Sequence, residues 1–448
     1  MSVDNPISSA HSHGLVTYIW RDRMIRFRHA QKFEFTSCGY LNSNKKQMRS
    51  MPILVLLLTL VFFSSATFPS RASELTAAFE AACERTPDIP VLAARRAEIG
   101  AKANAAEALL PGGPWTTLVH RTDALTNDRG TREYEAEFGV PIWLRGERGT
   151  ALSAALTEGE RIEAEIAAKR LEVAKRVREA YWMVAEAREK LSIAERRRAT
   201  SGSLAKSLRD QSQSGQAQLI DTKLADADVG DAEAALAALR SELHQANIAF
   251  QVLTGTAAPA GFREHDAGSA APANHPRIVL QTVAIQKAQA DEGLVWAVDR
   301  ERPEFSAFIN NNTDTNVEPN VTSLGVRLKI PFAYDAVNAP KRAAAAADVI
   351  AAHEELALAE REVGGEAAQA RARLDGARKQ LTALEARRSA LGSVVQLTQN
   401  SQRAGQSELN DLIRARLQLY DAELSRATAR IAVERARSDV NQALGLEP

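Results

Sequence analysis

The sequence predicts a mainly α-helical protein that also contains four β-strands and uses one structural unit twice. Long stretches of the 448-residue chain repeat apolar residues at alternating spacings of three and four, as in helices that pack as coiled coils. Four short segments alternate apolar and polar residues instead, which is typical of strands with two different faces. Short motifs recur in the same order about 190 residues apart, which indicates a tandem duplication.

The N-terminal 72 residues have the features of a targeting segment. Basic residues at positions 45, 46 and 49 precede the apolar run Pro52–Phe63, and small residues stand at positions 70 and 72. We expect a signal peptide at 48–72, cleaved after Ala72, and an upstream mis-start or disordered stretch at 1–47. An uncleaved anchor is the alternative, but the apolar run is too short for a helix that crosses a bilayer.

The duplication divides the rest of the chain into two repeats. Pro141 and Pro331 are 190 residues apart, as are the first glycines of GQAQLID and GQSELND, while Pro87 and Pro276 are 189 apart. Three matches in order favour one duplicated unit. We expect repeat 1 at 73–253, a linker rich in Ala, Gly and Pro at 254–274, and repeat 2 at 275–448.

Each repeat contains a shorter helix, two strands, one very long helix and a returning helix. The first helices are expected at 74–110 and 276–300, and the long helices at 149–212 and 341–402. About 60 residues of helix extend roughly 90 Å. The returning helices end near Leu253 and Leu444. Heptad seams on the two long helices and the two returning helices require partner helices, so a soluble coiled-coil rod is the plain alternative.

The four strands argue against a plain rod. Two strong segments, 132–142 and 322–332, follow two weaker ones, 115–124 and 305–313. The strong strands each have one charged and one apolar face. The charged face carries Glu133, Glu135, Glu137, Arg327 and Lys329, and the apolar face carries Tyr134, Phe138, Ile142, Leu324, Val326, Leu328, Ile330 and Phe332.

Two architectures bury the apolar face and keep the charged face wet. In a small β-sandwich the apolar face points inward, and in a closed membrane barrel it points toward lipid. Four strands cannot close a barrel alone, whereas three chains would supply twelve. The long helices and the predicted signal peptide favour the barrel.

At this point the chain resembles the TolC outer-membrane efflux protein family. The resemblance runs from about Glu74 to the C-terminus and depends on the duplicated helix–hairpin–helix plan, the prolines that end the second strands, and the paired G-Q-x-x-L-x-D turns. It implies a homotrimer with a shared twelve-stranded outer-membrane barrel and a helical periplasmic tunnel in a Gram-negative bacterium. The corner Pro141–Ala155 is similar to that of the CzcC-like branch, which serves heavy-metal efflux.

The resemblance also assigns roles to residues. The charged strand face would line the lumen and the apolar face would contact lipid, with Tyr134 or Trp115 near a membrane interface. The turns would form periplasmic tips that meet an adaptor (membrane fusion) protein beneath an inner-membrane pump of the resistance-nodulation-division type. The tip residues are Gly215, Gln216, Leu219, Asp221, Gly405, Gln406, Leu409 and Asp411. The alternative is a helix–helix turn without a partner.

Several classes of function are disfavoured by the sequence. Lys and Arg number 56, as do Asp and Glu, so no net field favours nucleic acid. The two cysteines and the scattered histidines lack metal-site spacing. No P-loop, dinucleotide turn or nucleophile elbow occurs, so we expect no enzyme, cofactor or metal site. The expected function is a passive conduit for cargo such as heavy-metal cations, and the alternative is a non-conducting secreted or periplasmic scaffold with a β cap.

Overall fold

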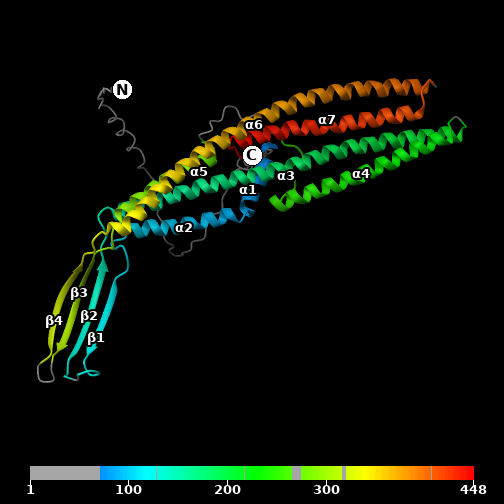
Figure 1. The fold of residues 1–448 in the computed structure, drawn as a ribbon. Coiled ribbons are helices and arrows are strands. Elements are labelled where there is room, and N and C mark those ends of the chain that lie inside the picture. The colour runs from blue at the N-terminus through cyan, green and yellow to red at the C-terminus, as the bar shows by residue number, and fades with distance from the viewer. Residues whose placement is uncertain (1–70, 128, 216, 265–273, 315–318, 405) are drawn as a thin grey trace, which may run out of the picture. The chain divides into compact units, whose positions relative to one another are not determined.

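The computed structural model describes residues 71–127, 129–215, 217–264, 274–314, 319–404 and 406–448. The expectations for 1–70, and for Gln216 and Gly405, lie outside these residues. The chain order alternates helical and strand elements as expected (Figure 1). The elements are α1 Arg71–Arg85, α2 Asp88–Glu107, β1 Trp115–Thr122, β2 Arg132–Pro141, α3 Glu147–Gln213, α4 Leu219–Thr254, α5 Pro276–Ala297, β3 Glu304–Thr313, β4 Val321–Lys329, α6 Asp335–Arg403 and α7 Leu409–Ala443.

The first predicted helix is two helices. The expected helix at 74–110 breaks between α1 and α2, at Thr86 and Pro87. Proline has no N–H to donate within a helix, and it disfavours helical geometry in the residue before it. The prediction of one continuous helix was therefore wrong at this point. The break lets α1 pack against both α3 and α4 while α2 follows α3 toward the sheet.

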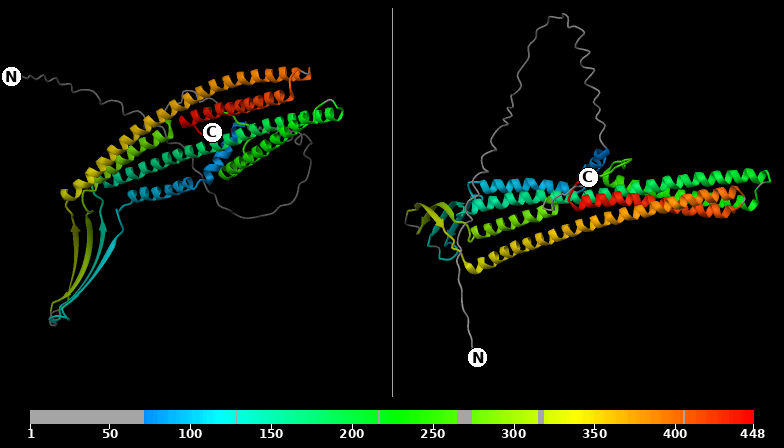
Figure 2. Two further views of the ribbon diagram at one scale, coloured as in Figure 1. Left: turned by 45° about the vertical axis from the view of Figure 1, so that its right-hand side comes forward. Right: turned by 90° about the horizontal axis from the view of Figure 1, so that it is seen from above.

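Two long helices form the frame of the described chain. The helix α3 has 67 residues and α6 has 69, so each extends about 100 Å. The helix α4 returns along α3, α7 returns along α6, and α5 lies between α3 and α6 (Figure 2). Among the described helices, none is both long enough and apolar enough to cross a membrane.

The four strands form one antiparallel sheet in the order β1-β2-β3-β4, at one end of the long helices (Figure 1). The predicted fourth strand was too long, because β4 ends at Lys329 and leaves Ile330 and Phe332 beyond it. Pro331 cannot donate a ladder hydrogen bond. Ile142 likewise follows the end of β2, but its N–H still donates to the carbonyl of Pro303 at 2.8 Å.

The two hairpins have matching registers. In the first hairpin Trp115 stands opposite Gly139, and in the second Glu304 stands opposite Lys329. Glu304 lies 189 residues after Trp115, and Lys329 lies 190 after Gly139. These are the two spacings at which the sequence motifs recur, so residues at those spacings hold equivalent places in the two hairpins.

The main core lies where α1 crosses the helical layer. Apolar side chains of α1, α3 and α4 meet there, including Phe79, Val177 and Phe250, which are fully buried. Beside this core, the Arg178 side chain donates to Glu264 at 2.7 Å and to the Leu446 carbonyl at 2.9 Å. This buried ion pair joins α3 to the segment after α4 and to the C-terminal turn.

Candidate functional site

One face of the sheet carries the charges that the sequence placed together. Glu133, Glu135 and Glu137 alternate along β2, and the strand register puts Arg327 and Lys329 of β4 on the same face. The charges are paired with one another. Arg327 binds Glu137 and lies 3.4 Å from Glu135, and Lys329 lies 3.3 Å from Glu304. Basic and acidic strands therefore neutralise each other across the sheet.

Residues that the sequence analysis missed complete this charged face. Arg121 of β1 pairs with Glu133, and Asn310 of β3 donates to the same carboxylate at 2.8 Å. Ser306 donates to Glu137, which also binds Arg327 and is only 5 % exposed. The period-two pattern of the weaker strands indicated that they have two faces. Assigning these residues to the charged face, however, required knowing which residues of β1 and β3 stand opposite β2.

The other face of the sheet is apolar and exposed. Phe138 is 55 % exposed and Leu324 is 83 % exposed, and their neighbours on this face are similarly open. Soluble proteins bury such a face and hydrate the charged one. Here the buried polar side chains of the sheet, Glu137 and Ser306, lie on the charged face, and in the described residues a second sheet does not cover the apolar face. The small sandwich, which was the alternative to the barrel, is therefore absent from this part of the chain.

Two aromatic residues lie over glycines on the charged face. The ring of Trp115 covers Gly139, and the ring of Phe308 covers Gly325, so that a Cβ on either glycine would overlap the ring. Such pairs restore packing where a strand has no side chain. This arrangement places the Trp115 ring on the charged face, and the expectation that Tyr134 or Trp115 lies near a membrane interface stays a prediction. Tyr134 does lie on the apolar face, where its ring stacks on His120 at 4.5 Å.

The junction between the sheet and α3 is tightly closed. Glu147 begins α3 after Gly146, whose φ of 84° is left-handed. The buried carboxylate of Glu147 accepts hydrogen bonds from the Leu144 N–H at 2.9 Å and from the Arg302 guanidinium at 2.7 Å. The Trp143 indole donates to the Ala108 carbonyl at 3.1 Å. The corner thus fixes the direction in which the sheet leaves the helices.

At the ends of the long helices opposite the sheet, two short turns connect α3 to α4 and α6 to α7. Gly215 has the left-handed φ of 76° expected of a helix C-cap. Asp221 and Asp411 lie in the first turns of α4 and α7, as predicted. The two predicted tip leucines differ: Leu219 is 69 % exposed, whereas Leu409 is 5 % exposed.

The burial of Leu409 corrects its assignment to an exposed tip surface. It packs against Ala205, Leu208 and Ala225 of the first helical hairpin. Leu219 and Gln406 are exposed. The two local sequences are alike, so the difference comes from tertiary packing of α7 on α3.

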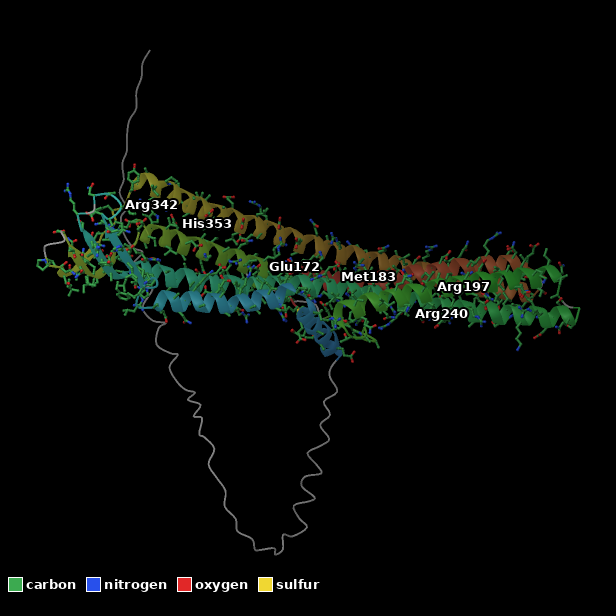
Figure 3. All side chains as sticks on the ribbon, turned by 90° about the horizontal axis from the view of Figure 1, so that it is seen from below. Glu172, Met183, Arg197, Arg240, Arg342 and His353 are labelled. Atoms are coloured by element: carbon green, nitrogen blue, oxygen red, sulfur yellow. The ribbon has the colours of Figure 1, made fainter. Side chains whose placement is uncertain are left out.

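Further contacts tie the two hairpins together above the tips. Arg430 of α7 binds Glu189 of α3 at 2.7 Å, and Arg197 of α3 lies over the Tyr420 ring of α7, 4.6 Å from its centroid. Figure 3 shows Arg197 toward the tips and Arg342 at the sheet end. Among the described residues, no group of three or more His, Cys, Asp or Glu side chains has the arrangement of a metal site.

Comparison with known proteins gives this geometry its context. Residues 78–256 match the family described as "Outer membrane efflux protein". The "Cobalt-zinc-cadmium resistance protein CzcC" of Cupriavidus metallidurans is 27 % identical over 237 residues, which are 50 % of this chain and 55 % of that protein. The chain thus matches about half the length of this curated relative. The corner Pro141–Ala155 had likewise indicated a similarity to the CzcC-like branch.

Solved structures share the fold over most of the chain. The channel protein CusC has a TM-score of 0.68 at 16 % identity, covering 84 % of this chain and 92 % of its own. The outer membrane protein VceC of Vibrio cholerae has a TM-score of 0.64 at 16 % identity, covering 83 % and 96 %. The open-state MtrE outer membrane channel of Neisseria gonorrhoeae has a TM-score of 0.65 at 19 % identity, covering 83 % and 89 %.

The family match, the curated relative and the shared fold agree with one another. The outer-membrane location expected from the sequence is confirmed by the family match. The predicted resemblance to TolC-type outer membrane efflux proteins is likewise confirmed.

Proposed function

We propose that three copies of this chain form an outer-membrane channel that conducts cargo passively. Each copy would contribute four strands to a shared twelve-stranded barrel and its long helices to a periplasmic tunnel. The observation that carries the proposal is the inverted sheet, with an exposed apolar face and a paired, partly buried charged face. A lipid-facing exterior and a wet interior satisfy both faces at once.

The energetics of the exposed face favour lipid over water. Burying a large apolar side chain is worth about 1.5–3 kcal/mol, and this face exposes many of them. The exposed members are Leu118, Tyr134, Phe138, Phe305, Ile309, Leu324, Val326 and Leu328. A non-conducting scaffold in the periplasm would leave this area in water, where apolar patches promote aggregation.

Open edges support the sharing of the barrel. Within the described residues β1 and β4 each have one neighbour, so each leaves a row of backbone groups unpaired. An open edge cannot face the hydrocarbon core of a membrane. Since β1 and β4 run in opposite directions, β4 of one copy and β1 of the next would continue the antiparallel pattern, and three copies give an even strand number.

The lumen would carry compensated charges. Acidic side chains of β2 pair with Arg121 and Arg327, so the wall is polar without a strong field of one sign. Such a wall admits varied cargo and leaves selection to a partner. Heavy-metal cations are the cargo that we propose, on the strength of the metal-resistance relative. The energy would come from an inner-membrane pump of the resistance-nodulation-division type.

The tips would contact a periplasmic adaptor. The described part of this surface includes Gly215, Leu219, Asp221, Gln406 and Asp411, and the buried Leu409 packs beneath it. Opening would require the contacts of Arg430 with Glu189 and of Arg197 with Tyr420 to loosen. Removal of 215–219 should leave trimers intact and abolish export, and unchanged export would remove the tip from the proposal.

Planar-bilayer recording of purified protein tests the channel itself. A trimeric sample spanning Ser73–Pro448 should give discrete conductance steps, and the same protein with both tips truncated should conduct more. Trimers that never conduct, with or without their tips, would contradict the channel and favour the scaffold. Trimer formation is measured separately by light scattering in detergent.

A further inference from the structure

The open edge of β4 allows a more specific statement about how two copies meet. We propose that β4 of one copy pairs with β1 of the next copy with Lys329 opposite Thr117 and Arg327 opposite Val119. This inference rests on the shared barrel proposed above and adds the register of its intermolecular junction. The occupant of the β4 edge is therefore a second copy of this chain.

The register follows from the junction between the repeats that the chain already contains. Inside one copy β2 of repeat 1 pairs with β3 of repeat 2, with Gly139 opposite Ser306. The residue that is equivalent to Gly139 in β4 is Lys329, 190 positions later. The residue that is equivalent to Ser306 in β1 is Thr117, 189 positions earlier. If repeat 2 meets the next repeat 1 in the same way, Lys329 stands opposite Thr117.

The faces of the sheet agree with this register. Lys329 and Thr117 both lie on the charged face, because Lys329 stands opposite Glu304 and Thr117 opposite Glu137. On the apolar face the same register puts Leu328 opposite Leu118, and both are exposed in the single chain. A shift by one residue would turn charged side chains toward lipid. Competing registers therefore differ by two residues or more.

The register also gives a reasonable barrel. Trp115 stands opposite Gly139, Gly139 opposite Ser306, and Ser306 opposite Arg327. Arg327 would then stand opposite Val119 of the next copy, so the path around one copy advances by about four residues and around three copies by about twelve. A barrel whose shear equals its strand number has a tilt of about 36°. Membrane barrels have tilts of roughly 35–45°.

A backbone contact at the end of the sheet supports the same junction. In repeat 1 the N–H of Ile142 donates to the carbonyl of Pro303, which belongs to repeat 2. The equivalent residues are Phe332 and Pro114, so proline recurs at the acceptor position. We expect the N–H of Phe332 to donate to the Pro114 carbonyl of the next copy.

The side chains at the two corners differ as this arrangement requires. Leu144 and Glu147 are 6 % and 1 % exposed, and repeat 2 covers this corner through Arg302. Their equivalents in repeat 2, Tyr334 and Val337, are 68 % and 53 % exposed. The connection from α2 to β1 of the next copy would cover the open corner.

Disulfide trapping tests the register. The variant Thr117→Cys/Lys329→Cys should form covalent dimers and trimers on oxidation, because directly opposed Cα atoms lie about 4.5–5.5 Å apart. The variants Thr117→Cys/Arg327→Cys and Val119→Cys/Lys329→Cys test shifts of two residues. These move the Cα atoms by about 6.8 Å along the strand and should give no cross-linking above the single-cysteine variants.

Two controls make every outcome informative. The intrachain pair Asn310→Cys/Ser323→Cys, opposed in the second hairpin, shows that oxidation works on this face. Cys83 is present throughout, but it is buried and burial raises the pKa of its thiol to about 11. Trimers that cross-link only through a shifted pair, or through none of the three, would overturn the register alone. A sample in which neither the parent nor any variant forms trimers would overturn the shared barrel.

Discussion

The substitution Phe138→Arg tests whether the apolar face of the sheet lies in lipid. Phe138 shares its row with Thr116, Ala307 and Val326, and further apolar rows flank it on both sides. It therefore lies near the middle of the apolar band. Arginine at the midplane of a membrane barrel costs about 2–4 kcal/mol. Three copies would bring the cost to roughly 6–12 kcal/mol per trimer if the sites act independently.

A matched substitution on the same strand supplies the control. Tyr134 lies four residues from Phe138, about 13 Å along the strand, in a row with His120, Asn311 and Thr322. This polar row marks the rim of the band, where arginine costs about 0–1 kcal/mol. The two sites should thus differ strongly, although their side chains are similarly exposed in the single chain.

The assay is the fraction of chain that assembles as heat-resistant trimer in the outer-membrane fraction. A cost of 2–4 kcal/mol reduces assembly by roughly 30- to 700-fold per copy, whereas Tyr134→Arg should retain most of the trimer. Phe138→Leu controls for packing. In water an exposed Phe138→Arg change would be worth no more than about 0.5 kcal/mol. Equal tolerance of Phe138→Arg and Tyr134→Arg would therefore refute the lipid assignment.

Three further changes test the helical part. Arg178→Ala should destabilise the protein by about 3–5 kcal/mol, because it leaves the buried carboxylate of Glu264 unpaired; a melting temperature equal to that of the parent would contradict the buried pair. Leu409→Ala should cost about 2–5 kcal/mol and increase protease cleavage at the tips, whereas Leu219→Ala in the isolated chain should not, and equal cleavage would contradict the different burial of the two leucines. Burial raises the pKa of Asp439, so the folded state binds the proton more tightly and stability falls as pH rises above the ordinary carboxyl range. Asp439→Asn should raise the melting temperature at pH 7 and flatten its dependence on pH, and a lower melting temperature would contradict that sign.

The sequence pattern predicted the sheet well because the pattern is local. In β2 each residue from Glu133 to Phe138 alternates between two faces, and the structure keeps every one of them on the expected face. The motif spacings likewise anticipated the equal registers of the two hairpins. Such patterns predict the faces of a strand reliably, because the alternation of side chains between the two faces depends on backbone geometry alone.

The misses involve residues whose role depends on distant neighbours. The packing of the Trp115 ring over Gly139 could not be predicted from the sequence, because it depends on the register that sets the two residues opposite each other. Glu147 reads as one more surface carboxylate of a helix start, but Arg302, 155 residues away, makes it part of a buried corner. Such contacts join segments that periodicity cannot bring together.

The two repeats differ at the corners and at the tips, and one rule accounts for both differences. At the corner, repeat 1 is covered by repeat 2 of the same chain, so Leu144 is buried and its equivalent Tyr334 is open. At the tip, repeat 2 rests on repeat 1, so Leu409 is buried and its equivalent Leu219 is open. Each repeat thus covers the corner of the one before it and supports the tip of the one after it.

Under the proposed junction the next copy closes the open corner, and the preceding copy supports the open tip. In α6 the equivalents of Ala205 and Leu208 are Val395 and Thr398, which are partly exposed in the single chain, so Leu219 of the next copy would pack against them. Opening of the tips would therefore require this contact between copies to be lost, in addition to the loosening of the contacts of Arg430 with Glu189 and of Arg197 with Tyr420 within one copy.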